Sequence, residues 1–356
     1  MIDKNIKYSL DDLTMIPAVQ STIDSRSECD PFDSLGMLPL ITSPMYSVID
    51  EINAHLFEEN GIYAAYPRKC QDTEDFIWHE SNKIPTFKSY GLEEFIQKFL
   101  KQNEKIEIPV YACIDIANGH MIKLTETVRK AKEKYGNNLI LMVGNIAHPD
   151  TYSVLSGAGA DYVRLGIGTG NACITSCNSS CHYPMGSLID ECRKRKDRAK
   201  IIADGGMKNF DDIIKALGLG ADYVMCGSIF NKAMESSGRT FVEISGFGIP
   251  DLSSPVDQYS ESTMNSFKMQ TTRYLKEYYG MSTKRAQKEM GNKMLKTSEG
   301  ITKYVNVEYT LPQWTENFIH YLRTAMSYTG KRNLDEFIGN VDFNVISNSA
   351  HAAYRK

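Results

Sequence analysis

The chain has 356 residues, and its 42% hydrophobic and 24% charged content is typical of a folded globular protein of one large domain or two ordinary ones. A net charge of −4 argues against a protein that holds nucleic acid on a broad basic surface, and favours a small-molecule partner. No apolar run approaches the roughly 20 residues that span a bilayer, and residues 1–10 lack an apolar signal core. We therefore expect a cytoplasmic protein.

Eight short apolar or aromatic runs predict eight β-strands, at 38–44, 61–67, 84–91, 109–115, 139–144, 161–166, 200–205 and 222–227. Helical periodicity lies between most of them, at 49–59, 92–101, 121–135, 151–157, 185–194 and 211–217. This alternation predicts parallel strands joined by helical crossovers. Eight repeats favour an α/β fold of the closed (β/α)8 barrel type over an open doubly wound sheet, which usually has about five or six strands.

The pattern changes after the eighth strand. Residues 231–310 carry few sustained apolar runs, so this segment is either a disordered insertion or a working flap. An amphipathic helix follows at 312–328, then a second helix at 334–338 and a polar tail. We expect residues 1–356 to form a single barrel domain with a flap at about 231–310 and C-terminal helices within about 312–340.

The eight cysteines are spread along the chain, which favours reduced thiols over a disulfide scaffold. Cys173 stands out because it follows a turn containing Gly166, Gly168 and Gly170, whose backbone can fold tightly around a ligand. It is either a nucleophile or a small packing residue. The cluster at 173–182, with cysteines at 173, 177 and 181 and a histidine at 182, could also suggest a metal site, but its spacing is wider than in common zinc sites.

The active site of a (β/α)8 barrel lies at the carboxyl ends of the strands. There the sequence places 115–119, 144–145, the Cys173 loop, 204–206 and 227–228. Glycines after the last two strands suit a phosphate bound by amide N–H groups, although each alone is explained equally by a tight turn. Asp204 could accept hydrogen bonds from ribose hydroxyls. Thr175 and Glu299 are the nearest candidates for handling protons.

Several motifs together resemble the IMP dehydrogenase/GMP reductase family. They occur in the family's order and span nearly the whole chain, at residues 8–17, 25–28, 115–119, 166–175, 202–206, 224–228, 279–282 and 298–300. The resemblance implies a barrel in which Cys173 attacks C2 of a purine nucleotide and forms a covalent thioimidate. It also implies that Thr175 and Glu299 manage the accompanying protons.

The two branches of this family run in opposite directions. A dehydrogenase oxidises IMP with NAD, usually carries a regulatory insertion after strand 2, and has an Arg-Tyr pair in its flap. Here only residues 68–83 separate predicted strands 2 and 3, and alanine follows Arg285. The resemblance therefore implies the reductase, which converts GMP to IMP and ammonia with NADPH. IMP dehydrogenase, and a non-catalytic barrel that binds a purine nucleotide, are the alternatives.

The resemblance also implies binding residues and a homotetramer. Residues implied to contact the nucleotide are Asp204, Gly205, Gly206, Gly227, Ser228, Gly280, Met281, Ser282, Glu299 and Gly300. Those implied to contact the cofactor are Ser25, Arg26, Asp115, Ile116, Ala117, Ile167, Gly168, Ser327 and Tyr328. Carbonyls of Gly168, Gly170 and Cys173 are implied to bind potassium.

The chain departs from the family pattern around the nucleophile. Asn171 stands where the family has a phosphate-binding serine, Thr169 where it has proline, and Ser176 where it has arginine. Outside the loop, Lys296 stands where the reductase has arginine. These departures affect the expected contacts to phosphate, the expected potassium site and the identity of the purine that is bound.

Overall fold

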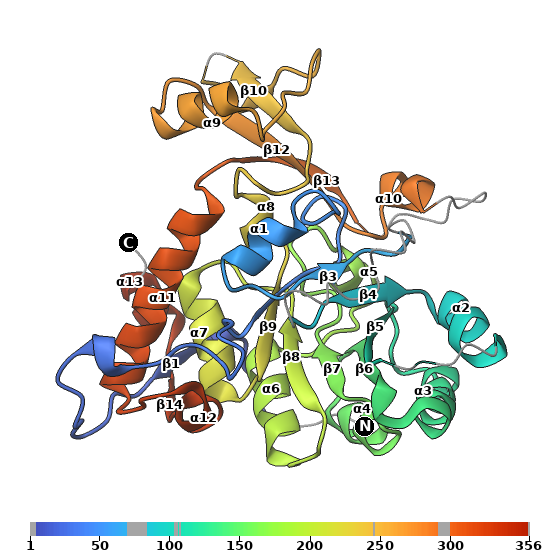
Figure 1. The fold of residues 1–356 in the computed structure, drawn as a ribbon. Helices are drawn as coiled ribbons and strands as arrows, with labels where there is room; N and C mark the ends of the chain where they lie inside the picture. Colours follow the sequence, from blue (N-terminus) through green and yellow to red (C-terminus); the bar gives the residue numbers. More distant parts are fainter. Residues whose placement is uncertain are drawn as a thin grey trace.

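The computed structural model describes residues 5–69, 84–102, 106, 108–244, 246–290 and 300–354. Its centre is an eight-stranded parallel sheet in the order β2-β9-β8-β7-β6-β5-β4-β3 (Figure 1). A parallel bridge between Ile41 and Tyr63 joins the two edges and closes the sheet. The strands are β2 (Leu40–Thr42), β3 (Ala65–Tyr66), β4 (Phe87–Tyr90), β5 (Val110–Asp115), β6 (Leu139–Ile146), β7 (Tyr162–Leu165), β8 (Lys200–Asp204) and β9 (Tyr223–Cys226). The predicted (β/α)8 barrel and its eight strands are confirmed.

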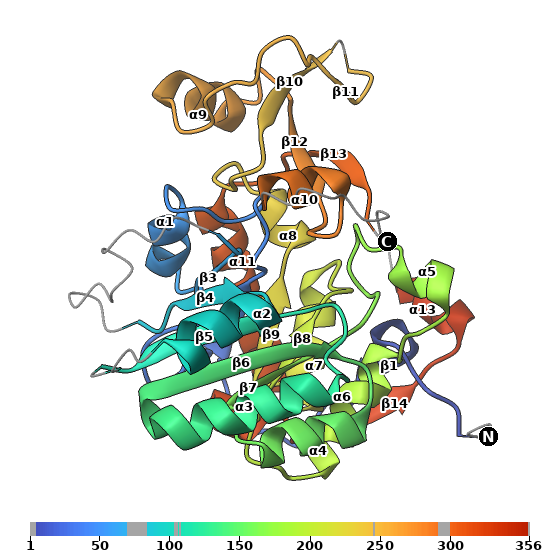
Figure 2. The ribbon, with the colours of Figure 1, turned by 90° about the vertical axis from the view of Figure 1, so that its right-hand side faces the viewer.

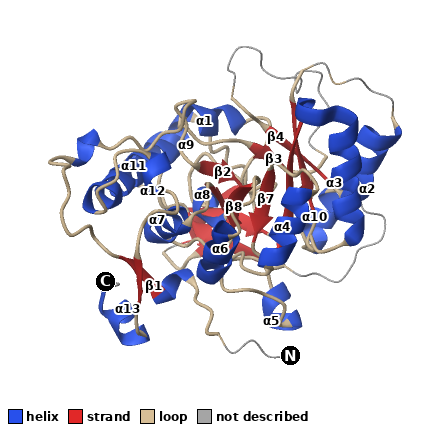
Figure 3. Ribbon diagram, turned by 90° about the horizontal axis from the view of Figure 1, so that it is seen from below, coloured by secondary structure: helices blue, strands red, loops and turns tan. Residues whose placement is uncertain are grey.

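Helices surround the strands, as the view from below shows (Figure 3). They are α1 (Ala54–Glu59), α2 (Leu92–Phe95) continued by a π-helix (Ile96–Lys101), α3 (Ile122–Tyr135), α4 (Pro149–Gly157), α5 (Thr175–Ser179), α6 (Met185–Lys194), α7 (Phe210–Leu219) and α8 (Ser228–Asn231). One buried cluster lies between strands and helices, and a second fills the barrel interior. Burial on both faces explains why the strands read as continuous apolar runs.

The first helix begins at Ala54, five residues later than its periodicity predicts. Asp50 Oδ1 accepts hydrogen bonds from the backbone N–H groups of Ile52 and Asn53, at 2.9 and 3.0 Å. This local turn offers the backbone an alternative to the helical hydrogen bonds and delays the helix.

The described residues of segment 240–306 include a small antiparallel sheet above the barrel (Figures 1 and 2). Its strands are β10 (Thr240–Ile244), β11 (Ile249–Pro250), β12 (Tyr274–Tyr279) and β13 (Thr302–Asn306), with α9 (Glu261–Lys268) and α10 (Lys284–Glu289) between them. We call this unit the flap sheet. The described part of the segment is therefore folded, and the alternative of a disordered insertion is wrong for it.

The predicted C-terminal helices are present as α11 (Leu311–Tyr328) and α12 (Leu334–Phe337). The expected polar tail contains two elements that the sequence did not predict, β14 (Phe343–Val345) and α13 (Asn348–Tyr354). β14 pairs antiparallel with β1 (Leu13–Met15), and a Cβ on Gly218 would lie 3.1 Å from the Phe343 ring. The contact of the Phe343 ring with Gly218 and the pairing of β14 with β1 therefore order the tail. Within the described ranges, no helix has the length and apolarity needed to cross a membrane.

Candidate active site

The predicted strand-end residues meet at the carboxyl mouth of the barrel. Asp115 ends β5 and Asp204 ends β8, while the Cys173 loop follows β7 and Gly227 follows β9. Parallel pairing places all four at the same end of the sheet. The sequence-based placement of a candidate site at this end agrees with the fold.

Cys173 lies in a tight turn before α5. Its backbone N–H donates to the carbonyl of Gly170 at 2.9 Å, and its Sγ donates to Thr175 Oγ1 at 3.3 Å. Cys173 is partly exposed and Cys177 and Cys181 are exposed, whereas Cys29, Cys113, Cys192 and Cys226 are buried. The loop thus presents a reachable thiol with a hydroxyl partner, which is the arrangement needed for a nucleophile and a proton carrier.

Strand β8 supports the Cys173 loop from one side. Thr169 Oγ1 donates to the carbonyl of Asp204 at 3.0 Å. Gly205 and Gly206 follow with φ of +89° and +85°, and a Cβ at Gly205 would lie 2.6 Å from Thr169 Oγ1. Only glycine meets both the backbone conformation and this close approach. The Asp-Gly-Gly motif is therefore required to seat the loop, apart from any role with a ligand.

The flap sheet covers the loop from the other side. Gly300 forms an antiparallel bridge with Cys173, and the N–H of Ile301 donates to the carbonyl of Ala172 at 3.1 Å. A Cβ at Gly300 would lie 3.0 Å from both Ala172 O and Ser282 Oγ, and one at Gly280 would lie 3.4 Å from Ala172 O. The predicted residues at 280, 282 and 300 thus gather beside the nucleophile candidate. Glu299 lies outside the described residues.

Sequence reasoning missed Arg164, which links two of the strand ends. It is 5% exposed on β7, and Nη1 donates to Asp115 Oδ1 at 2.8 Å. Nε and Nη2 both donate to Asp204 Oδ2, at 3.1 and 2.7 Å, and Asn145 Nδ2 donates to that same oxygen at 2.7 Å. The only available signal was one arginine within the apolar run 162–165.

These ion pairs set the charge state of the network. Burial raises the pKa of Asp115, but its ion pairs with Arg164 and Arg68 outweigh burial and hold that pKa below its ordinary value. Burial lowers the pKa of the Arg164 guanidinium, yet Asp204 and Asp115 raise it well above its ordinary value. The Asp115 carboxylate therefore stays ionised at neutral pH.

Tyr278 was also missed, although it belongs to the tyrosine-rich run at 274–279. It lies on β12 and is 4% exposed. Burial, followed by electrostatic interaction with Asp204 and Cys173, raises the pKa of its phenol. Its hydroxyl is therefore a neutral hydrogen-bonding group within electrostatic range of both residues.

The residues expected to contact a cofactor fall into two groups. Asp115, Ile116, Ala117, Ile167 and Gly168 belong to the mouth. Ser25 and Arg26 instead lie at the short helix η2 (Arg26–Glu28) beside α11, where Arg26 Nη1 donates to Thr324 Oγ1 at 3.2 Å. Ser327 and Tyr328 end α11, and the figures show this helix on a different side of the barrel from α5 (Figures 1 and 3). One copy of the chain does not bring the two groups together.

Two of the three carbonyls expected to hold potassium accept hydrogen bonds inside the loop. Gly168 O accepts from Ser176 Oγ at 2.7 Å, and Gly170 O accepts from the N–H of Cys173 at 2.9 Å. Ser176 is one of the residues that departs from the family pattern. Among the described residues, no group of three or more cysteine, histidine or acidic side chains is placed to hold a metal ion, so the cluster at 173–182 is not such a site.

Arg285 of the flap contacts two acidic side chains and one aromatic ring. Its guanidinium pairs with Glu277 and with Glu289, the latter at 3.2 Å, and lies 4.6 Å from the centre of the Tyr279 ring. The Tyr279 hydroxyl donates in turn to Glu289 at 2.9 Å. Arginine and tyrosine are thus both held within the flap by acidic partners.

Comparison with known proteins agrees with this geometry. The family model described as "IMP dehydrogenase / GMP reductase domain" matches residues 100–247 and 252–354. The GMP reductase of Oceanobacillus iheyensis is 31% identical over 351 residues, covering 96% of each chain. The GMP reductase of Bacillus subtilis is 30% identical over 352 residues, covering 96% of this chain and 97% of the relative. The chain belongs to the IMP dehydrogenase/GMP reductase family.

Proposed function

We propose that this protein is an oxidoreductase that converts GMP, or a closely related guanine nucleotide, to the corresponding hypoxanthine nucleotide and ammonia. The observation that carries the proposal is the placement of Cys173, hydrogen-bonded to Thr175 and paired with Gly300 of the flap. Relatives named GMP reductase match over nearly the whole chain. The family and the geometry thus support the same reaction class.

In the proposed reaction the Cys173 thiolate forms a C–S bond at C2 of the purine. The bond between C2 and the exocyclic amino nitrogen breaks. The amino group gains a proton and leaves as ammonia, and a thioimidate remains on Cys173. NADPH supplies the hydride that replaces sulfur at C2. The C–S bond then breaks, and its electron pair returns to Cys173 as thiolate.

Thr175 and Glu299 are proposed to move the protons of the departing amine. Thr175 Oγ1 lies 3.3 Å from the Cys173 sulfur. When that sulfur is bonded to C2 of the purine, the hydroxyl is within reach of the amino group that leaves C2. Glu299 directly precedes Gly300 in the sequence, and Gly300 pairs with Cys173. A carboxylic acid at that point of the chain would replace the proton that the weakly acidic Thr175 hydroxyl passes to the departing amine.

The nucleotide is proposed to lie across the ends of β8 and β9. Gly205, Gly206, Gly227 and Ser228 offer backbone N–H groups to its phosphate, and Gly280, Met281, Ser282 and Gly300 contact it from the flap. Asp204 is proposed to accept from the ribose hydroxyls. Its Oδ2 already accepts three hydrogen bonds, so a ribose would use Oδ1.

The cofactor is proposed to be held by Asp115, Ile116, Ala117, Ile167 and Gly168 of one copy. Ser25, Arg26, Ser327 and Tyr328 would come from a neighbouring copy in a homotetramer, since α11 begins near the flap and its C-terminal end, at Tyr328, lies at the opposite end of the barrel. A potassium ion would share Gly168 O and Gly170 O with the hydrogen bonds inside the loop, and we assign it no step.

The test is to incubate the purified protein with GMP and NADPH while measuring NADPH absorbance and released ammonia. Equal amounts of NADPH consumed and ammonia formed are expected. NAD reduction with IMP in place of this reaction would identify a dehydrogenase. Noncovalent nucleotide binding without turnover would identify a non-catalytic barrel. Either result would overturn the proposal.

A further inference from the structure

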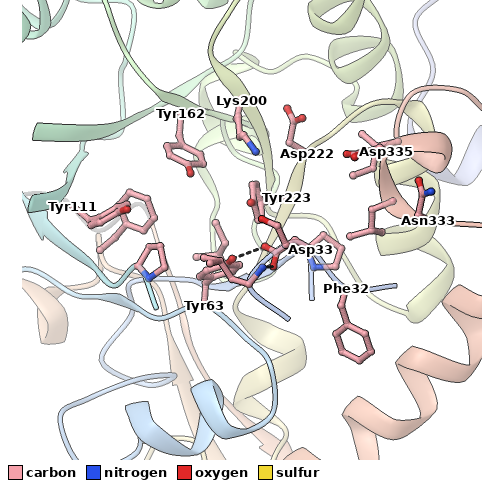
Figure 4. A pocket seen from close by; sticks show the side chains of 18 residues that line it. Phe32, Asp33, Tyr63, Tyr111, Tyr162, Lys200, Asp222, Tyr223, Asn333 and Asp335 are labelled. Atoms are coloured by element: carbon pink, nitrogen blue, oxygen red, sulfur yellow. Dashed lines mark hydrogen bonds between the residues drawn. The ribbon is translucent and has the colours of Figure 1, made fainter. Parts of the chain in front are cut away.

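A cavity of about 410 Å³ opens at the amino ends of the barrel strands, opposite the end that carries Cys173 (Figure 4). Its lining includes the first residues of β4, β7, β8 and β9, which are Phe87, Tyr162, Lys200 and Tyr223. Segments 32–35 and 333–338 supply the remaining walls. The proposed reaction uses none of these residues.

The base of this cavity is a continuous row of aromatic rings, which we call the aromatic floor. Ring centres are separated by 5.6 Å for Tyr63 and Tyr223, 5.9 Å for Tyr223 and Tyr162, 5.3 Å for Tyr162 and Phe87, and 5.4 Å for Phe87 and Tyr111. The floor covers the lowest layer of the barrel interior. Aromatic faces attract cations through their quadrupole, so the floor favours a positively charged group.

Three carboxylates and one ammonium line the cavity above the floor: Asp33, Asp222, Asp335 and Lys200. Asp33 is held as an acceptor by the Tyr63 hydroxyl and by the backbone N–H groups of residues 35 and 37. Asp222 Oδ2 accepts from the backbone N–H of Ile201 at 2.7 Å, and its Oδ1 lies 3.7 Å from Arg193 Nη1. Asp335 lies exposed on α12. The charge of the lining therefore repels anions and attracts cations.

Lys200 shows that the floor accepts an ammonium group. Its Nζ lies 5.3 Å from the centre of the Tyr223 ring, and the residue is exposed, so its long side chain is not locked in place (Figure 4). A ligand with its own ammonium group would take this position when Lys200 moves toward solvent. Lys200 thus marks the position at which a ligand's ammonium group would bind, and it competes with the ligand for that position.

We propose that the cavity binds a small organic cation, in which a primary ammonium or a guanidinium group is attached to a planar or short aliphatic body. The cationic group faces the aromatic floor and the carboxylates, and the body fills the space beneath segments 32–35 and 333–338. A neutral ligand of the same shape gains the apolar contacts but loses the charge interactions. This assignment is independent of the reaction at the other end of the barrel.

The test measures binding of benzylammonium, benzyl alcohol and benzoate to the full-length protein by isothermal titration calorimetry and ligand-observed NMR. These probes share a ring and differ in charge. Benzylammonium is expected to bind at least about threefold more tightly than benzyl alcohol, since an exposed cation–π contact alone is worth about two- to fivefold. Benzoate is expected to bind more weakly than both. Equal binding of cation and alcohol, or tighter binding of benzoate, would overturn the proposal.

Two exposed residues give variants that should not disturb folding. Asp335→Asn is expected to weaken benzylammonium binding about two- to threefold through the lost charge, and Lys200→Met to strengthen it by removing the competitor. Glu316→Gln, an exposed acidic position on α11 outside the lining, is the matched control and is expected to leave binding unchanged. Affinities that do not differ among the unaltered protein, Asp335→Asn and Lys200→Met would place the probe elsewhere and contradict the assignment.

Discussion

The guanidinium of Arg164 donates two hydrogen bonds to a single carboxylate oxygen of Asp204, at 3.1 Å from Nε and 2.7 Å from Nη2. Its remaining nitrogen, Nη1, reaches Asp115 at 2.8 Å. One buried side chain thus fixes the carboxyl ends of β5 and β8 relative to each other. These are the ends proposed to hold the cofactor and the ribose.

Arg164→Met should destabilise the protein by about 3 kcal/mol or more, because it leaves two carboxylates without their buried partner. Urea unfolding followed by circular dichroism measures the change. Arg195→Met is the control, since Arg195 pairs with Asp150 at the surface and its loss should cost less than about 1 kcal/mol. Similar losses in the two variants would show that the buried network contributes no special stability.

Gly205→Ala should reduce stability by about 1–3 kcal/mol and lower turnover. The added methyl group meets Thr169 Oγ1 at 2.6 Å, and φ is +89°. Gly157→Ala is the matched control, because Gly157 is helical in α4 and its Cβ would meet nothing within 4 Å. That variant should be unchanged or slightly stabilised. Thermal melts and GMP-dependent NADPH oxidation distinguish the two, and an unaffected Gly205→Ala variant would contradict the packing described for the loop.

The free energy of unfolding should rise with pH above neutrality because of Lys276. Its ammonium is fully buried in the flap sheet and donates to the carbonyls of Ser236 and Gly238, at 2.5 and 3.2 Å. Burial lowers the pKa of Lys276 to about 7, against about 10.4 in the unfolded chain. Between these values the unfolded state binds more protons, so the free energy of unfolding increases with pH.

The check is urea unfolding of the unaltered protein and Lys276→Met between pH 7 and 8.5. Burial raises the pKa values of the nearby acids Glu235 and Asp50 above their ordinary acidic values. Their titration therefore changes the free energy of unfolding from the acid side of the pH range. The variant should show a smaller rise in unfolding free energy over this interval. Parallel curves for the two proteins would mean that Lys276 does not titrate there.

Thr175→Ala should lower kcat about 100-fold with a small change in KM, as expected for loss of a positioned proton carrier. Ser179→Ala, in the same short helix, is the control because its hydroxyl bonds to backbone groups, donating to the carbonyl of Thr175 and accepting from the N–H of Cys181. Steady-state kinetics with GMP and NADPH measure both variants. A Thr175→Ala enzyme that changes KM alone would assign the hydroxyl to binding.

The sequence predicted the barrel because its signal is local and repeated eight times. Each strand is a short apolar run, and most of the intervening segments show 3.6-residue periodicity. The late start of α1 was missed because the Asp50 turn depends on one side chain competing with the helix. The C-terminal strand was missed because β14 pairs with β1, at the far end of the chain.

The site was predicted only where a motif marks it. Cys173, Thr175 and Asp204 were singled out from the glycine-rich turn and the strand ends. The ordered family motifs added their roles and the flap residues at 280–282, and the structure gathers the described ones around one loop. Arg164 and Tyr278 carry no motif, and their importance depends on burial beside residues far away in the sequence. The cavity at the opposite end has no sequence signal either, since its aromatic residues are dispersed over five strands or strand ends.

The central claim is that Cys173 forms a covalent intermediate with the guanine nucleotide. Mass spectrometry of the acid-quenched protein after reaction with GMP tests it most directly. We expect an adduct on the peptide containing Cys173, equal in mass to GMP less ammonia, and none in Cys173→Ala, which still binds nucleotide but does not turn over. An adduct on another residue, or full activity in Cys173→Ala, would contradict it.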